Sequence, residues 1–380
     1  MKKILFLHGS SELYGASKVL LSILASLDRK TIKPIVVLPY RGILYDNIKS
    51  LGVSVEIGPI AILRRQNFNP VGSIGLISDL IKSIRFIRKL DKAYSIDMVY
   101  SNTSAVLSGA IYTRLFRKKH IWHVHEITVT PALFRWLMPR LINTFSDACI
   151  AVSNAVKSYL VSSGIGKTNI TVVYNGTDGL RKAASRVDSK PYEGKKVVGM
   201  VGRLNRWKGQ EVFVGAASKV IESGLDVQFL IAGSCFKNEE IYDDRLKKLI
   251  STLKLEGKVR IVGFVDDIAG FYEDIDILVV PSILPEPFGL VAIEAMSCKK
   301  PIIASNIGAL PEIVVDGKTG VLFEPGDAEQ LKNAIIQLIK DDALCLAMGQ
   351  AGFERQAVCF NGEKFRKGIN EVIWTSLEEE

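Results

Sequence analysis

The sequence has 380 residues, of which 48% are hydrophobic and 23% are charged, as is ordinary for a soluble globular protein. This length exceeds what one typical core can organise, so we expect two domains. Because no segment approaches 18 consecutive apolar residues, we expect no membrane-spanning helix.

The cysteines and the N-terminus indicate the compartment. The five cysteines show no C-x-x-C or zinc-like spacing, which predicts reduced thiols in a cytosolic protein. The first residues, MKKILFLHGSS, contain an apolar core of only Ile4–Leu7. That core is too short for a signal peptide, and we expect it to form the first strand.

The positive charge is unevenly distributed along the chain. Residues 1–190 carry 27 Lys and Arg against 11 Asp and Glu, whereas the remaining residues carry 22 against 29. A basic half beside a mildly acidic half predicts an anionic partner for the first half. Nucleic acid and an anionic phospholipid leaflet are the two candidates.

The first unit of structure predicted along the chain is a strand, a turn and a helix. Lys2–Leu7 is predicted as the strand, and Gly15 opens the helix after a loop of small and polar residues. Such a helix N-terminus can hold a phosphate, although Gly15 equally serves the turn alone. Further strands are expected at Lys33–Leu38 and Val53–Ile57.

Two later segments combine apolar and basic residues. Ile62–Tyr94 has the spacing of an amphipathic helix, which either packs on the sheet or lies on a membrane surface. Pro131–Phe145 is interpreted as an exposed aromatic and basic loop that suits bilayer docking, or as part of the core.

The sequence HIWHVHE suggests a zinc site, but the pattern argues against one. In a strand, His123 and His125 share one face while His120 lies on the other, and no cysteine accompanies them. Ala148–Val152 and Thr171–Tyr174 are the last strands expected in the first domain. Residues 179–195 are polar, basic and aperiodic, which predicts an interdomain linker.

A new apolar strand, Val197–Val201, is predicted to open the second domain. It runs into Gly202 and Arg203, and Lys208 stands at the entry to the next helix. One Arg and one Lys at the carboxyl end of a strand can clamp a diphosphate and stabilise a nucleotide leaving group. The alternative is two solvated cations.

The segment Pro281–Cys298, PSILPEPFGLVAIEAMSC, is predicted as a strand exit, a loop and a helix. Two prolines keep Glu286 in extended geometry, and Glu294 lies about one turn into the helix. The alternative is a solvated loop charge and a surface helix residue. We expect free backbone N–H groups to point outward from the helix N-terminus, where they suit a phosphate. They belong to Phe288, Gly289 and Leu290.

The rest of the second half repeats the pattern of a strand with small residues at its end. The expected strands are Gln228–Ala232, Val259–Val262, Ile277–Val280 and Ile302–Ala304, followed by a hairpin-like DGKTG segment. The expected final helices are Ala328–Lys340, Ala343–Ala357 and Glu363–Leu377.

Glu286 and Glu294 with seven residues between them, EPFG, and the segment GRLNRWKG resemble motifs of glycosyltransferase family 4. This resemblance is strong over about 197–323. It implies the GT-B fold: two Rossmann-like, doubly wound parallel-sheet α/β domains facing across a cleft. The expected domains are 1–178, joined by the last helix (361–380), and 196–360, with 179–195 as the linker.

The resemblance also implies a retaining, metal-independent enzyme with a nucleoside-diphosphate sugar as substrate and no cofactor. Arg203 and Lys208 would hold the diphosphate, Glu294 the ribose, and Glu286 with the loop N–H groups the sugar. His125, followed by an acidic residue, matches the histidine that faces the transferred sugar. Family members often have two adjacent glycines where this chain has Gly15 and Ala16, so Gly15 is the expected donor contact.

The acceptor is expected at the basic first domain, as a glycan or a lipid-linked glycan of surface polysaccharide assembly. A cytoplasmic location is expected, with peripheral contact to an anionic membrane and no nucleic acid. The alternatives are a sugar-nucleotide epimerase of the same fold and a non-catalytic nucleotide-binding protein. A glycoside hydrolase also uses two carboxylates. In this chain, however, Glu286 and Glu294 lie in a phosphate-type loop with Arg and Lys partners, unlike a hydrolytic pair.

Overall fold

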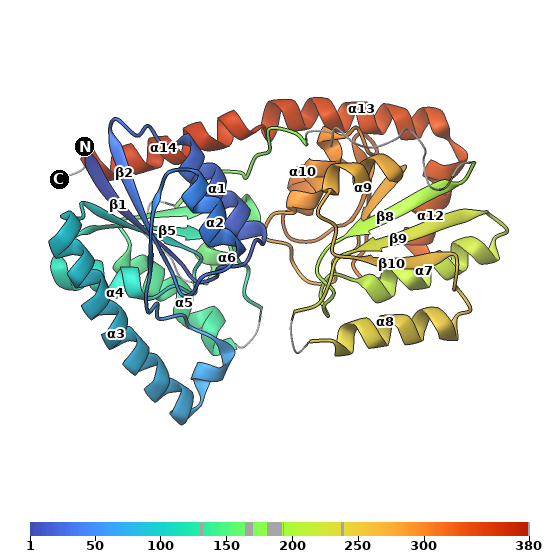
Figure 1. The fold of residues 1–380 in the computed structure, drawn as a ribbon. Coiled ribbons are helices and arrows are strands. Elements are labelled where there is room, and N and C mark those ends of the chain that lie inside the picture. The colour runs from blue at the N-terminus through green and yellow to red at the C-terminus, as the bar shows by residue number, and fades with distance from the viewer. Residues whose placement is uncertain (130–131, 164–169, 181–191, 193, 237–238, 379–380) are drawn as a thin grey trace. The chain divides into compact units, whose positions relative to one another are not determined.

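The structure, a computed structural model, describes residues 1–129, 132–163, 170–180, 192, 194–236 and 239–378. The chain divides into two compact units (Figure 1). Unit 1 comprises Met1–Asn175 and Gly362–Glu380, and unit 2 comprises Gly176–Asn361. Each is a parallel sheet with helices on both faces, so the predicted pair of doubly wound α/β domains is confirmed.

Unit 1 contains a seven-stranded sheet in the order β3-β2-β1-β4-β5-β6-β7. Its strands are β1 Lys2–His8, β2 Ile32–Leu38, β3 Ser54–Ile57, β4 Met98–Asn102, β5 Lys119–Val124, β6 Ala148–Ala151 and β7 Ile170–Val172. Its helices are α1 Gly15–Ser26, α2 Ile43–Ser50, the 3-10 helix η1 Arg65–Phe68, α3 Pro70–Tyr94, α4 Ser108–Phe116, α5 Ala132–Phe145, α6 Asn154–Ser162 and α14 Gly362–Glu378.

Unit 2 contains a six-stranded sheet in the order β10-β9-β8-β11-β12-β13. Its strands are β8 Lys196–Val201, β9 Val227–Ala232, β10 Val259–Gly263, β11 Ile277–Val280, β12 Ile302–Ser305 and β13 Gly320–Phe323. Its helices are α7 Gln210–Glu222, α8 Ile241–Thr252, α9 Ile268–Asp274, α10 Leu290–Ser297, α11 Leu310–Ile313, α12 Ala328–Lys340 and α13 Asp342–Cys359.

The central strands are continuous apolar runs because helices cover both faces of each sheet. Residues 4–7 of β1 are all fully buried, and so are residues 35–38 of β2. A strand buried on both sides needs apolar residues at successive positions, not at alternate ones. This is why the apolar runs in the sequence predicted the strands.

The last helix of the chain packs on unit 1. α14 contacts α1, β5 and β6, and it buries Phe365, Ile369 and Ile373. The boundary between the units falls at Asn175, three residues before the expected 178. The reason is local: Thr177 donates its N–H to the carbonyl of Phe360 over 3.0 Å, which ties residues 176–178 to unit 2. Within the expected linker, residues 181–191 and 193 lie outside the described residues.

Two local expectations are wrong. The segment from Ala132 to Phe145 is not a loop but a helix, α5. Its residues Phe134, Met138 and Ile142 recur at helix spacing and are buried, as the alternative of a core segment predicted. The DGKTG segment does not turn into a hairpin, since β13, which begins within it at Gly320, pairs in parallel with β12.

Candidate functional site

In unit 2 the predicted residues gather where the strand order reverses. β8 has β9 on one side and β11 on the other, and helices leave the carboxyl ends of both β8 and β11. In open α/β sheets, ligands bind outside the carboxyl ends of the strands at this switch point. The loop after β8 carries Arg203 and Lys208, and the loop after β11 carries Glu286.

The loop after β8 is held in a fixed path. The side-chain oxygen of Asn205 accepts hydrogen bonds from the backbone N–H of Trp207 and of Lys208, each over 3.1 Å. Gly209, the residue before α7, has a φ of +77°, and a Cβ there would lie 1.8 Å from the carbonyl oxygen of Pro281. Only glycine lets the loops after β8 and β11 approach this closely.

The two predicted cations of this loop, Arg203 and Lys208, have ordered surroundings. The guanidinium carbon of Arg203 lies 3.5 Å from the ring centroid of Phe236, a cation–π contact that orients the side chain. Lys208 Nζ donates to Glu286 Oε1 over 2.5 Å, with both side chains largely buried. This ion pair joins the loops after β8 and β11.

Glu286 is fixed from three sides. Its Oε1 also accepts from Ser282 Oγ over 2.6 Å, and its carbonyl accepts from Ala309 N–H over 2.8 Å. Gly308, with a φ of +63°, approaches the Glu286 backbone so closely that a Cβ would lie 2.4 Å from its carbonyl oxygen. The carboxylate is thus presented by a loop with little freedom to rearrange.

Glu294 lies on α10 and is buried together with its partner. Tyr272, fully buried at the end of α9, donates its hydroxyl to Glu294 Oε2 over 3.1 Å. Burial and the nearby Glu294 carboxylate raise the pKa of Tyr272 well above its usual value, so it remains a donor. One carboxylate oxygen of Glu294 is therefore held by the protein.

The start of α10 presents main chain and no capping side chain. Gly289 precedes the helix with a φ of +113°, and no side chain caps the N-terminus. Phe288 is buried against Phe360, with ring centroids 5.9 Å apart, so its contribution to a ligand would come from its backbone. Leu290 is the first residue of the helix. An uncapped helix N-terminus beside two cations suits a phosphate group.

In unit 1, His125 follows β5 and belongs to a chain of buried polar contacts. Asn102, at the end of β4, donates its amide nitrogen to His8 Nδ1 over 3.0 Å, and its amide oxygen lies 2.9 Å from His125 Nε2. Because an amide oxygen only accepts, His125 carries its proton on Nε2 and keeps Nδ1 as an acceptor. His8 Nε2 in turn pairs with Ser17 Oγ over 3.0 Å.

Burial keeps these imidazoles neutral. It lowers the pKa of His8 to about 4 and that of His123 to about 3, and it lowers the pKa of His125 well below its usual value. His123 Nδ1 pairs with the hydroxyl of Tyr100 over 2.7 Å, and its ring packs 4.0 Å from that of His125. His123 therefore has the packing role that its buried strand position predicts, while His125 is partly exposed.

Glu126 anchors the loop that carries His125. Its Oε2 accepts from the backbone N–H and the hydroxyl of Ser104, over 3.0 and 2.8 Å, and from His125 N–H over 3.2 Å. Gly15 is the exposed first residue of α1 and lies near the same network, since Asn102 also donates to the carbonyl of Ala16 over 3.1 Å.

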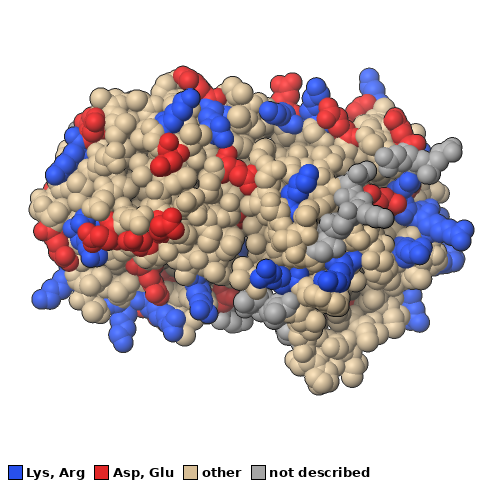
Figure 2. Space-filling view, turned by 180° about the vertical axis from the view of Figure 1, so that it is seen from behind, with Lys and Arg blue, Asp and Glu red and all other residues tan. Residues whose placement is uncertain are grey.

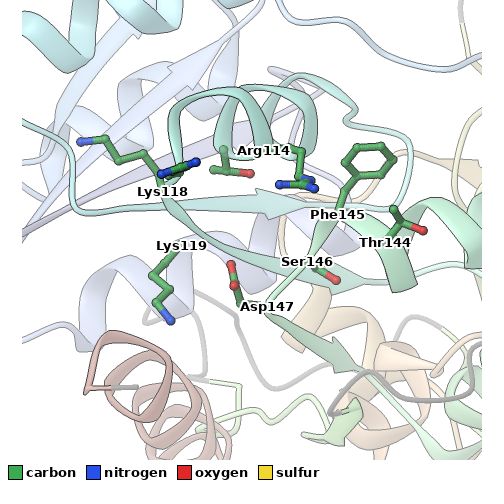
Figure 3. A pocket seen from close by; sticks show the side chains of 9 residues that line it. Arg114, Lys118, Lys119, Thr144, Phe145, Ser146 and Asp147 are labelled. Carbon is green, nitrogen blue, oxygen red and sulfur yellow. The ribbon is translucent and has the colours of Figure 1, made fainter. Parts of the chain in front are cut away.

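A separate polar pocket of about 300 Å³ lies at the opposite edge of the unit 1 sheet (Figure 3). Arg114, Lys118, Lys119 and Asp147 line it, between α4 and the starts of β5 and β6. Lys118 is engaged elsewhere, since its Nζ lies 3.3 Å from Asp91 Oδ1. None of the predicted site residues lines this pocket.

The structure thus brings together, within unit 2, eight predicted residues: Gly202, Arg203, Lys208, Glu286, Phe288, Gly289, Leu290 and Glu294. Gly15 and His125 belong to unit 1. Sequence reasoning missed Tyr272, Ser282 and Asn102, which hold the predicted side chains. Among the residues described, no three or more His, Cys, Asp or Glu side chains cluster as metal ligands.

Two family models match the chain. The model of Glycosyltransferase Family 4 matches residues 14–179, and the model of Glycosyl transferases group 1 matches residues 181–355. Two doubly wound units with this loop pair define the class of GT-B glycosyltransferases. The chain belongs to glycosyltransferase family 4, and the predicted family and fold are confirmed.

Solved structures and curated proteins resemble the chain over most of its length. Crystal structures of HepE from Anabaena, in complex with UDP-glucose or with UDP and glucose, superpose with a TM-score of 0.82 at 27% identity, covering 99% of this chain and 100% of theirs. The capsular polysaccharide biosynthesis glycosyltransferase CapM of Staphylococcus aureus is 26% identical over 80% of this chain and 81% of its own. The lipopolysaccharide core biosynthesis mannosyltransferase LpcC of Rhizobium leguminosarum bv. viciae is 28% identical over 65% of this chain and 68% of its own.

In the part of the chain that the structure describes, no helix combines the length and the hydrophobicity needed to cross a bilayer.

Proposed function

We propose that this glycosyltransferase moves a sugar from a nucleoside-diphosphate donor to a glycan or lipid-linked acceptor, with retention of the anomeric configuration. The observation that carries this proposal is the placement of Arg203, Lys208 and Glu286 on the two loops that leave β8 and β11 at the switch point of unit 2, with Glu294 on the helix that follows the second loop. This is the donor set that a diphosphate, a ribose and a sugar together require.

The role of each side chain follows from its chemistry. Arg203 and Lys208 hold the diphosphate and stabilise the charge that develops on the leaving nucleotide. Lys208 has three N–H donors, so it keeps Glu286 with one while the others contact phosphate oxygens. Glu294 accepts from ribose hydroxyls, with its carboxylate oriented by the hydroxyl of Tyr272. Gly202, Gly289 and Leu290, with Phe288, contribute backbone around the diphosphate and sugar.

In unit 1, we propose that His125 contacts the transferred sugar through Nδ1, which accepts a hydrogen bond from a sugar hydroxyl. Burial keeps this imidazole neutral, and Asn102 holds its Nε2 proton, so Nδ1 is an acceptor in support of this role. Gly15 is proposed as a backbone contact for the donor. Most of the catalysis comes from positioning and leaving-group stabilisation, because no protein nucleophile is required for either.

The acceptor class is proposed from the relatives and the charge. CapM and LpcC are named for capsular polysaccharide and lipopolysaccharide core biosynthesis, and HepE was crystallised with a UDP-sugar. The basic residues 1–190 suit an anionic, lipid-linked acceptor at the cytoplasmic face of a membrane. Surface polysaccharide biosynthesis is therefore the process that we propose.

A thermal-shift panel tests the donor site. UDP-, GDP-, ADP- and dTDP-sugars are compared on the wild type, on Glu294→Ala, and on the exposed control Glu324→Ala. We expect one donor class to stabilise the wild type and the control but not Glu294→Ala. Stabilisation by none of the donors, or equally in all three proteins, would refute the proposed site.

The stereochemistry and the metal independence have separate tests. Proton NMR of the product shows whether the new linkage has the anomeric configuration of the donor, and inversion contradicts a retaining enzyme. Activity measured after exhaustive EDTA treatment is expected to be unchanged, because Arg203 and Lys208 supply the positive charge. Product analysis without acceptor separates transfer from epimerisation of the donor.

A further inference from the structure

Helix α3 of unit 1 has an apolar side that is largely exposed in the described structure. Its buried side chains Ile87 and Leu90 belong to the core of the unit. The other side of its first turns carries Val71, Ile74, Ile77 and Ile81, which are exposed to 80, 69, 58 and 46%. At 100° per residue these four share one face, so they form a continuous aliphatic stripe.

The start of α3 is fixed by a capping residue and a proline. Asn69 caps it by accepting from Gly72 N–H over 2.8 Å, and Pro70 is its first residue. Twenty-five residues make a helix of about 37 Å. Figure 1 shows its amino end extending beyond the sheet of unit 1, and Figure 2 shows that end as a protrusion without charged residues on the visible face.

A second exposed apolar pair lies beside this end. Phe68, just before α3, packs against Phe134 of α5 with ring centroids 6.0 Å apart. Leu133 and Trp136 of α5 are each 54% exposed. We call the side chains of Val71, Ile74, Ile77, Ile81, Leu133 and Trp136 the apolar end of unit 1.

Basic residues adjoin the apolar end. Lys82, Arg85, Arg88 and Lys89 follow the stripe along α3 and are all exposed. On α5, the guanidinium carbon of Arg140 lies 4.1 Å from the ring centroid of Trp136. Asp79 is the one acidic residue among 70–90. Aliphatic residues and a tryptophan bordered by cations complement an anionic bilayer: the apolar groups enter the acyl boundary, and the cations meet the headgroups.

We propose that the apolar end of unit 1 inserts into the surface of an anionic membrane. The protruding, convex shape favours a lipid surface over a second copy of the chain, because a protein partner would need a matching groove. The proposal rests on the proposed function, in which the acceptor is lipid-linked. It adds the part of the molecule that makes the contact.

The test is co-sedimentation with vesicles, without donor or acceptor. Vesicles of phosphatidylcholine alone are compared with vesicles that also contain phosphatidylglycerol. The double variant I74Q/I77Q is compared with the wild type and with L346Q/V358Q. The control pair lies on α13 of unit 2 and is similarly exposed, to 74 and 67%. Glutamine preserves helix propensity.

We expect the wild type and the control to sediment with anionic vesicles. The partition coefficient of I74Q/I77Q onto these vesicles should be lower by about tenfold or more, because two large aliphatic side chains no longer enter the lipid. Equal partition of all three proteins would overturn the assigned surface. Equal binding to neutral and anionic vesicles would overturn the contribution of the cations.

Analytical ultracentrifugation without lipid tests whether a second copy of the chain binds this surface instead. A wild-type dimer that becomes a monomer in I74Q/I77Q would overturn the membrane proposal and assign the surface to a second copy. Circular dichroism and the thermal shift with donor show whether the variants are folded. Because the donor residues lie in unit 2, loss of vesicle binding with intact donor binding keeps this proposal distinct from the proposed function.

Discussion

Lys208 and Glu286 form an ion pair between two loops that are 78 residues apart in the chain. Breaking a largely buried pair leaves an uncompensated charge, so neither side chain is a simple surface group. Arg203 is held differently, by the face of Phe236. The two cations of the proposed diphosphate clamp are thus oriented by protein contacts before a ligand arrives, and such preorganisation is where electrostatic catalysis originates.

This leads to a prediction for the cations. Arg203→Met and Lys208→Met should each lower kcat by about 10²–10³, because each removes a charge that stabilises the leaving nucleotide. The control is Arg206→Met, an exposed cation of the same loop. Steady-state kinetics on purified protein with matched circular dichroism spectra measures the effect. An equal loss in the control would show that the loop, and not the two named charges, is responsible.

Tyr272 provides a second prediction at the residue scale. Tyr272→Phe removes the hydroxyl that holds Glu294, so the carboxylate should swing and the donor Kd rise about fivefold, the equivalent of about 1 kcal/mol. Isothermal titration calorimetry with the donor measures it. Tyr242→Phe, a partly buried tyrosine on α8, is the matched control. Unchanged donor affinity in Tyr272→Phe would contradict the positioning role.

At the scale of elements, α14 connects the end of the chain to unit 1. Its buried residues contact α1, β5 and β6, and β5 leads to His125. The apolar spacing of the sequence predicted this helix within one residue at each end. Its packing on unit 1 was expected only from the family resemblance, because periodicity reveals which face is buried but not against what.

We predict that Ile369→Ala destabilises unit 1 by about 2–5 kcal/mol, since Ile369 is a fully buried residue of α14. Hydrogen exchange followed by mass spectrometry measures this, because it reports peptides of each unit separately. Faster exchange should be confined to peptides of unit 1. Glu371→Ala, an exposed position of the same helix, is the control and should change little. Equal acceleration in unit 2 would contradict the division of the chain.

How far the sequence predicts the molecule also differs between elements. Continuous apolar runs predicted the central strands, because helices cover both faces of the sheets. The candidate site residues within Pro281–Cys298 were predicted because the motif of two glutamates directly follows the end of a predicted strand. Tyr272, Ser282 and Asn102 were missed, because a hydrogen bond to a partner far along the chain leaves no local pattern. The helix α5 was missed because Pro139 and the mixed composition resemble a loop.

At the scale of the whole molecule, all four histidines of the chain lie in unit 1. Burial lowers the pKa of His8 and His120 to about 4, of His123 to about 3, and of His125 well below its usual value. An unfolded histidine binds its proton near pH 6.5, whereas these folded ones do not until much lower pH. Acid therefore favours the unfolded form of unit 1.

We predict that unit 1 is the acid-sensitive half. Its stability should be full above about pH 6.5 and fall as the pH drops toward about 4, by up to about 1.4 kcal/mol per pH unit for each histidine. Hydrogen exchange at pH 7 and pH 5, corrected for the intrinsic rate, measures both units in one sample. Unit 2, without histidine, should change less. A parallel loss in both units would contradict this assignment.

We propose above all that unit 2 binds a nucleoside-diphosphate sugar through Arg203, Lys208 and Glu294. The most direct measurement is a crystal structure of the chain with the donor that gives the largest thermal shift. We predict that Arg203 and Lys208 contact the diphosphate and that Glu294 contacts the ribose. A donor bound elsewhere, with these three side chains turned away from it, would contradict the account.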